Sequence, residues 1–237
     1  MSFKERFFLN FIKDSRWHYL TDGLIVTLQV TFFAVLLGIA IGVVIAAIRS
    51  THDKLIGNTK SGFSKFVLKF FNSIANVYLT VIRGTPVTVQ LMLAYYVIFV
   101  TSNDKIMIAV LAFGINSGAY VAEIVRSGIM SVDEGQSEAG RSLGFNYIQT
   151  MFHIVLPQAF KNVLPALANE FIVLLKETSV CGYVALQDLT RGGDIIRGRT
   201  YDAFFPLLAV AAIYLIMVMC FSRLVSLLER RLRKSER

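Results

Sequence analysis

The 237-residue chain is strongly apolar, with 55% hydrophobic residues, 17% charged residues and 19 Phe. Soluble domains of this length seldom have such a balance, so the composition favours a membrane protein. The formal net charge of +8 also occurs in nucleic-acid-binding proteins, but the basic residues here flank apolar runs, so we expect no nucleic-acid partner. The 2 Cys and 3 His are scattered along the chain, which predicts neither a disulfide nor a zinc site.

Residues 1–20 precede the first long apolar run and carry both basic and aromatic side chains. Their apolar stretch is too short for a cleavable signal peptide, so we expect an extracytoplasmic or interfacial amphipathic segment. The run Leu24–Ile48 is long enough to cross a bilayer, which takes about 20 apolar residues. Within it, Gly38 and Gly42 either admit a second helix at close range or reflect the high frequency of glycine in membrane helices.

Residues 66–100 are too long for one straight span and are interrupted by the sequence Arg-Gly-Thr-Pro at 83–86. Polar side chains before the interruption recur every three or four positions, which places them on one helical face. They are Lys65, Lys69, Asn72, Asn76 and Thr80. We predict an amphipathic helix, a break at Pro86 and a single crossing, with two separate spans as the alternative.

Further apolar runs at 106–125, 163–175 and 203–228 complete an all-α fold, a polytopic transmembrane helical bundle of about five spans. Basic residues concentrate in the 49–69 loop and at the C-terminal end, which assigns both to the cytosol. The N-terminus then lies outside, and the loop at about 130–157 lies in the cytosol. We divide the chain into the N-terminal segment, a membrane domain at 21–228 and a basic cytosolic tail at 229–237.

The sequence contains no nucleotide-binding GxxxxGK[ST] motif and no hydrolase or metalloprotease motif. We therefore expect a protein that is not an enzyme, and that draws any energy for transport from another chain or from an ion gradient. An ion channel or ion-driven carrier remains an alternative, in which intramembrane Glu and Asn line a pore. An integral membrane enzyme has no catalytic constellation to support it.

The predicted cytosolic loop contains the half-polar stretch 138–157. Helix-forming residues dominate 136–143, Gly144 permits a tight or left-handed turn, and apolar residues spaced three or four apart predict a second helix over 145–155. This pattern indicates either a rigid projecting knob or an ordinary interfacial loop.

Six positions of this stretch resemble the "EAA" loop of ABC-importer permeases: Glu138, Ala139, Gly144, Ile154, Leu156 and Pro157. Gly140 stands where the family has a second Ala, so we expect the packing to hold with some loss of helix propensity. Other segments resemble the polar amino acid branch of that family, which imports histidine, glutamine, arginine and cystine. They are GLIVTLQVT at 23–31, RGTP at 83–86, YVAEIVRSG at 120–128, Gly135-Gln136 and NEFIVLLKETS at 169–179, and the resemblance extends over residues 20–225.

The resemblance implies the ABC type I importer permease fold and a multi-pass protein of the bacterial plasma (inner) membrane. The implied partners are two copies of an ABC ATPase, a second permease subunit that is identical or homologous, an extracytoplasmic solute-binding protein, an amino acid substrate and membrane lipid. No cofactor is expected on this chain, because the partner ATPase binds ATP and Mg. The resemblance assigns ATPase coupling to Glu138, Ala139, Gly140, Ser142, Leu143 and Gly144.

A zwitterionic substrate inside the membrane needs compensating charge and hydrogen bonds. The candidates are Asn169 and Glu170 first, then Asn116, Ser117 and Glu123. Each acid also has a structural alternative, because Glu123 can pair with the nearby Arg126, and Glu170 with Lys176 or with a neighbouring span.

The sequence also suggests roles for Arg83 and for residues 190–199. We expect Arg83 to fix the break at Pro86 rather than to bind substrate. Residues 190–199 form either a contact for the binding protein or a plain solvated loop. A permease for another small solute, such as methionine or an organic ion, is the nearest alternative function.

Overall fold

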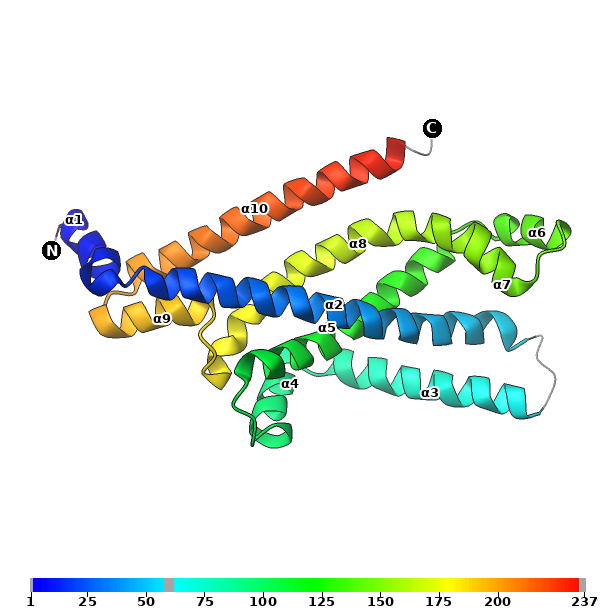
Figure 1. The fold of residues 1–237 in the computed structure, drawn as a ribbon, viewed down its shortest axis with the longest axis horizontal. Coiled ribbons are helices and arrows are strands. Elements are labelled where there is room, and N and C mark those ends of the chain that lie inside the picture. Colours follow the sequence, from blue (N-terminus) through cyan, green and yellow to red (C-terminus); the bar gives the residue numbers. More distant parts are fainter. Residues whose placement is uncertain (1, 58–61, 235–237) are drawn as a thin grey trace. The chain divides into compact units, whose positions relative to one another are not determined.

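The computed structural model describes residues 2–57 and 62–234, and these residues form helices joined by short connections (Figure 1). Lys60 and residues 235–237, parts of the predicted cytosolic loop and tail, lie outside the described residues. The α-helices are α1 (Phe3–Phe7), α2 (His18–Leu55), α3 (Phe63–Gly84), α4 (Val87–Leu93), α5 (Lys105–Met130), α6 (Glu134–Ser142), α7 (Tyr147–Thr150), α8 (Leu156–Glu177), α9 (Leu189–Thr200) and α10 (Phe204–Lys234). Short helical turns of other types are η1 (Phe8–Ile12), η2 (Lys13–Ser15), η3 (Ala94–Ile98), η4 (Met151–Val155) and η5 (Thr178–Val184).

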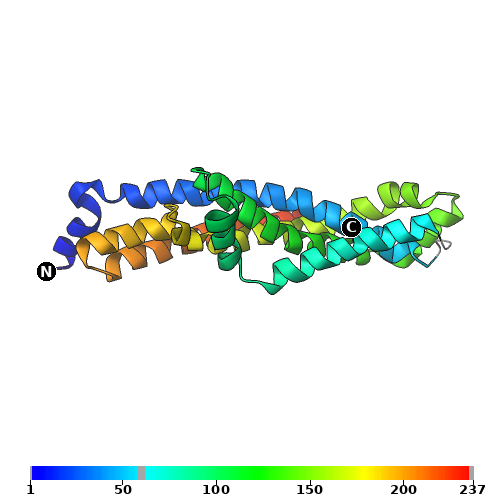
Figure 2. The same cartoon turned by 90° about the horizontal axis from the view of Figure 1, so that it is seen from below.

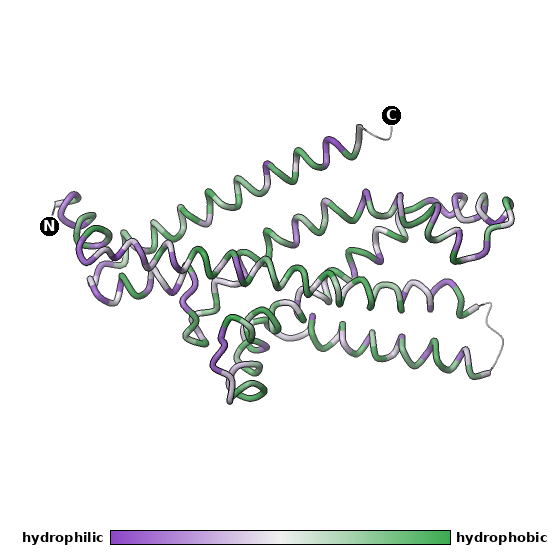
Figure 3. Tube along the Cα trace, viewed as in Figure 1, coloured by the Kyte–Doolittle hydropathy of each residue, from purple (hydrophilic) through white to green (hydrophobic). Residues whose placement is uncertain are grey.

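Within the described residues, 4 helices are long and apolar enough to cross a membrane, namely α2, α3, α5 and α10. Hydrophobic residues run along most of α2 and α10 in Figure 3. The predicted span at 163–175 is helical as part of α8, but polar residues such as Lys161, Asn162 and Glu170 interrupt this helix, and it is not among these four. The all-helical membrane architecture is therefore confirmed, while a crossing by α8 stays a prediction.

The predicted break at Pro86 is confirmed in the backbone. Helix α3 ends at Gly84, and Thr85 is extended, with φ −122° and ψ 145°, before α4 begins at Val87. The residue before a proline is driven out of the helical region by its ring, and proline itself offers no N–H to continue the helix. The Thr85 hydroxyl donates to the Val81 carbonyl at 2.8 Å, which closes the last turn of α3.

The chain divides into two compact units, and the long helices α2, α5, α8 and α10 contribute to both. The first unit contains the chain up to Leu36, Pro86–Gly114 and Phe171–Leu224, and the second contains Leu37–Thr85, Ile115–Glu170 and the chain from Val225.

In the first unit, α2 and α9 pack backbone to backbone. A Cβ atom on Gly192 would lie 2.2 Å from the Tyr19 carbonyl oxygen, so only glycine permits this approach. The core beside this contact consists of Phe11, Leu20, Leu189, Ile196, Phe205 and Val210.

The first unit also holds the N-terminal segment against the turn between α9 and α10 (Figure 2). Arg6 donates two hydrogen bonds to the Asp202 carboxylate, at 2.9 and 2.7 Å, and the buried Asn10 donates a third at 2.9 Å. The Asn10 side-chain oxygen Oδ1 accepts from the Thr200 hydroxyl at 2.8 Å. The Arg6 guanidinium lowers the pKa of Asp202 to about 2. The N-terminal segment is thus tied to α9–α10 by a network of side-chain hydrogen bonds.

In the second unit, α2 packs on α5 through the two glycines spaced four apart. A Cβ on Gly42 would lie 2.5 Å from Val121 Cγ1, and one on Gly38 would lie 2.9 Å from Ser117 Oγ. This contact confirms the close-approach interpretation of the GxxxG pattern.

Candidate functional site: the α6–α7 segment and the charged interior

The α6–α7 segment, residues 134–155, consists of two short helices joined by a tight turn (Figure 1). Helix α6 follows Asp133, whose carboxylate accepts from the Gly135 N–H at 2.8 Å. It ends before Leu143, and Gly144 has a positive φ of 84°. A Cβ on Gly144 would meet no atom within 4 Å, so backbone conformation alone selects glycine there.

Helix α7 is capped by Asn146 and Gln149. The Asn146 side-chain oxygen accepts from the Gln149 N–H, and the Gln149 side chain accepts from the Asn146 N–H, both at 2.9 Å. The chain continues through η4 directly into α8. The two predicted helices and the turn at Gly144 are confirmed, but α6 begins two residues earlier than predicted. The missed signal was Asp133, a strong N-cap residue.

The two helices of the segment are packed together rather than loosely joined. Gly140 is buried, and a Cβ there would lie 2.9 Å from Ile154 Cδ1 and 3.0 Å from Thr150 Cγ2. Beneath them, Val155 is buried with Ile129 and neighbouring apolar residues. The segment is therefore a folded knob, packed on itself around Gly140 and against α5 and α8 through Val155.

The knob exposes large apolar side chains as well as charged ones. Leu143, Ile148 and Phe152 are 75%, 64% and 65% exposed. Exposed large apolar side chains are candidates for an interaction surface. The ion pair of Glu138 and Arg141, at 3.8 Å, is exposed on both sides and adds little stability.

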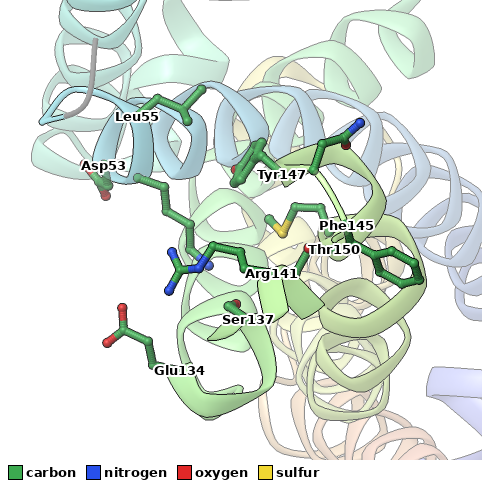
Figure 4. Close-up of a pocket in the computed structure, with 11 residues that line it drawn as sticks. Asp53, Leu55, Glu134, Ser137, Arg141, Phe145, Tyr147 and Thr150 are labelled. Atoms are coloured by element: carbon green, nitrogen blue, oxygen red, sulfur yellow. The ribbon is translucent and has the colours of Figure 1, made fainter. Parts of the chain in front are cut away.

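A cavity of about 600 Å³ lies between the end of α2 and the α6–α7 segment (Figure 4). Asp53, Glu134 and Arg141 lie on one side of the view, while Phe145 and Tyr147 lie across from them. Burial raises the pKa of Tyr147, although a hydrogen bond with Thr51 of α2 opposes the shift. This contact ties the knob to the end of α2.

Inside the second unit, the Ser117 hydroxyl of α5 donates to the Glu170 carboxyl of α8 at 2.8 Å. Ser117 is 0% and Glu170 is 9% exposed, so an acidic group lies buried between the candidate span α5 and α8. Asn116, the neighbour of Ser117, is buried as well, whereas Asn169 is exposed. Two of the five predicted substrate residues thus contact each other directly.

Glu123 lies in a separate cluster with arginines from three helices. Its nearest partner is Arg49 of α2 at 2.7 Å, followed by Arg83 of α3 at 3.7 Å and Arg126 of its own helix at 3.9 Å. Sequence proximity pointed to Arg126, but Arg126 lies closer to Asp53, at 3.0 Å. Arg49 was missed, because the sequence offers no sign of which helix faces Glu123.

The segment 190–199 is a helix, α9, so of its two alternatives the plain solvated loop is wrong. Its N-cap is Asp188, whose carboxylate accepts from the N–H groups of Thr190 and Arg191 at 3.0 and 3.1 Å. Burial raises the pKa of Asp188 to about 6. A role in contacting the binding protein stays a prediction.

Comparisons with known proteins identify the group to which this arrangement belongs. Residues 61–234 match the family described as "Binding-protein-dependent transport system inner membrane component". The chain belongs to this family of transport permeases. The permease is 36% identical over 217 residues to the putative glutamine transport system permease protein GlnP of Rickettsia typhi, which covers 90% of this chain and 93% of the relative.

Two further relatives extend the comparison. The permease is 33% identical over 221 residues to the arginine transport system permease protein ArtQ of Bacillus subtilis, with 92% and 94% of the two chains covered. The crystal structure of an amino acid ABC transporter with histidines contains a chain of 43% identity and TM-score 0.80, covering 93% of this chain and 98% of that one.

These relatives confirm several expectations. The chain is the permease subunit of an ABC importer, it has the fold of ABC importer permeases, and it is a multi-pass membrane protein rather than an enzyme. An ATPase and a solute-binding protein belong to such a system. The channel and ion-driven carrier alternatives are not supported. Among the described residues, no group of 3 or more His, Cys, Asp or Glu is placed to hold a metal.

Proposed function

We propose that this permease forms the translocation pathway for a polar amino acid delivered by an extracytoplasmic solute-binding protein. The observation that carries the proposal is the Ser117–Glu170 contact, a buried acid with a hydroxyl donor at 2.8 Å. An acidic group inside membrane-spanning helices is costly and is retained where it serves a pathway. It offers a partner for the ammonium group that every amino acid carries. The names of the relatives, which include glutamine, arginine and amino acid transporters, support the same substrate class.

The α6–α7 segment provides the coupling to the ATPase in this proposal. Its two helices share a core around Gly140, so a displacement of α6 carries α7 with it. The exposed Leu143, Ile148 and Phe152 offer apolar area for a groove on the ATPase. Closure of two ATPase subunits on ATP and Mg then moves the knobs of two permease subunits, identical or homologous, and alternates access across the membrane.

The proposal places the knob and the C-terminus in the cytosol and the N-terminal segment on the outer side. Residues 49–69 and the C-terminal end carry the basic excess that favours the cytosolic side of a bacterial inner membrane. Residues 1–20 then lie outside or in the interface, and 229–237 form the cytosolic tail.

Uptake by reconstituted protein tests this function. The permease with its ATPase in proteoliposomes should accumulate a radiolabelled polar amino acid only when ATP is enclosed on the ATPase side and the binding protein is outside. Glutamine, arginine, histidine and cystine form the panel. Accumulation by the permease alone, or no uptake of any panel amino acid by the complete system, would contradict the proposal.

A further inference from the structure

A second polar cavity, of about 500 Å³, lies within the second unit between α2, α3 and α5. We name it the Arg83 pocket. Its lining includes Arg49, Asn76, Thr80, Arg83, Tyr120 and Glu123. The lining thus carries two guanidinium groups and one carboxylate, which leaves an excess of one positive charge inside membrane-spanning helices.

The excess charge lies on Arg83. Arg49 forms an ion pair with Glu123 at 2.7 Å, and only 19% of the Arg49 side chain is exposed. The charges of these two residues therefore neutralise each other. Arg83 lies 3.7 Å from the same carboxylate oxygen, longer than a hydrogen bond, and its side chain is 46% exposed. Arg126 does not line the pocket and is paired with Asp53 at 3.0 Å.

The kink between α3 and α4 does not require the Arg83 guanidinium. The extended backbone of Thr85, the ring of Pro86 and the Thr85–Val81 hydrogen bond account for the end of α3. The expectation that Arg83 serves to fix the break therefore leaves its exposed charge unexplained. A charge within a membrane-spanning helix is costly unless it is paired or used.

We propose that Arg83 binds the carboxylate of the transported amino acid, an inference that rests on the proposed function. A guanidinium presents two parallel N–H donors that match a carboxylate, and the ring of Tyr120, 5.7 Å from Arg83 Cζ, supports its plane. Asn76 and Thr80 lie on the same face of α3, about two turns and one turn before Arg83, and add hydrogen-bonding groups.

The position along α5 fits a zwitterion. Tyr120 follows Ser117 by one helical turn, about 5 Å along the axis. The pathway therefore offers an acidic group, Glu170, and a guanidinium, Arg83, at neighbouring levels of α5. An amino acid meets a partner for its ammonium at one and a partner for its carboxylate at the other.

The test compares amino acids with their α-carboxamides on the purified permease–ATPase complex without the binding protein. Binding of L-glutamine, L-arginine and L-histidine is measured by equilibrium competition against the corresponding carboxamide. The wild type should prefer the carboxylate by about tenfold or more, because hydrogen bonds to charged groups are stronger than neutral ones. Arg83→Gln should abolish this preference, and Arg83→Lys should keep part of it.

Two further variants keep the test decisive. Arg126→Gln makes the same change of charge outside the pocket and should retain the wild-type preference. Asn76→Asp leaves Arg83 in place but adds a competing carboxylate at an exposed position, so it should lower the preference even if Arg83→Gln does not fold.

The outcomes separate this inference from the function on which it rests. If the complete wild-type system takes up an amino acid and Arg83→Gln discriminates against the carboxamide as the wild type does, the inference is wrong and the function stands. Another outcome is that Arg83→Gln keeps the preference for the carboxylate and changes only how uptake depends on phosphatidylglycerol in the vesicles. Arg83 then binds a lipid headgroup, and the inference is wrong as well. If no panel amino acid is taken up, the proposed function fails and the inference with it.

Discussion

Gly144 is the residue whose conformation decides the shape of the α6–α7 segment. Its φ of 84° is unfavourable for any side chain, although there is open space around its Cβ position. Gly144→Val should cost about 2 kcal/mol locally, since a left-handed conformation is strained for L-residues and most of all for β-branched ones. We expect membrane insertion to persist while co-purification of the ATPase, or its response to binding protein and substrate, is lost.

Gly198→Val is the matched control for this change. Gly198 lies in α9, where a Cβ would meet no atom within 4 Å and φ is not positive. This variant should retain co-purification of the ATPase, because α9 lies outside the α6–α7 segment. Normal coupling in Gly144→Val, with hydrogen exchange over 134–155 unchanged, would show that the turn does not position the coupling helix.

Gly140 shows what residue-level pattern reasoning can and cannot supply. The sequence indicated a small residue at a packed position, and the structure shows Gly140 buried against Thr150 and Ile154. The sequence did not indicate that Ile154 Cδ1 lies 2.9 Å from the position that a Cβ on Gly140 would take. The family's alanine at this position would therefore require Ile154 to shift. Sequence alone does not predict this, because the rotamers of side chains on two packed helices depend on three-dimensional packing.

At the scale of elements, the N-terminal segment is held by polar contacts at a single place. The Asp202 carboxylate accepts from Arg6, Asn10 and the Phe204 N–H, and its side chain is 10% exposed. We predict that Asp202→Asn releases residues 3–12, with hydrogen exchange about tenfold faster, because charge-assisted hydrogen bonds become neutral ones.

The pH dependence of this contact follows from the lowered pKa. Because the pKa of Asp202 falls from its usual 3.8 to about 2 in the folded protein, its contribution to stability is complete above about pH 4 and is lost as the pH falls toward 2. Protection of residues 3–12, corrected for intrinsic exchange, should therefore stay constant from pH 8 to 5. Asp194→Asn is the control, since both partners of Asp194 lie within α9. Equally fast hydrogen exchange of residues 3–12 in Asp202→Asn and Asp194→Asn would contradict a specific role of Asp202 in holding the N-terminal segment.

Elements with strong local signals were predictable, and those decided by distant contacts were not. The break after α3 follows from Thr85 and Pro86 alone, as the structure confirms. For residues 190–199 the sequence left a plain solvated loop as one of two alternatives, and the three glycines of this segment disfavour a helix. Packing outweighs this low helix propensity in the structure. Gly192 and Gly193 are buried against α2 and α10, where larger residues would not fit.

At the scale of the whole molecule, hydropathy predicted the helical membrane class, and charge indicated which residues matter inside it. The sequence did not predict which of these residues contact each other. For Glu170 the sequence left Lys176 or a neighbouring span open, and its partner is Ser117 of the span α5, 53 positions earlier. Glu123 was predicted near Arg126, and its closest partner is Arg49. Such pairs depend on how helices rotate about their axes, which packing of small residues such as Gly38 against Ser117 determines.

The role of Glu170 is a property of transport by the whole molecule, and substitution tests it there. Glu170→Gln keeps an oxygen that accepts from the Ser117 hydroxyl, so the helices should still pack and the purified yield and thermal midpoint should be preserved. The variant loses the acidic group, so uptake should fall about tenfold or more if that group meets the substrate's ammonium. Glu229→Gln, the same change in α10, should transport as the wild type does. Unchanged uptake kinetics in Glu170→Gln would make the buried acid a packing element and would remove the observation on which the proposed substrate class rests.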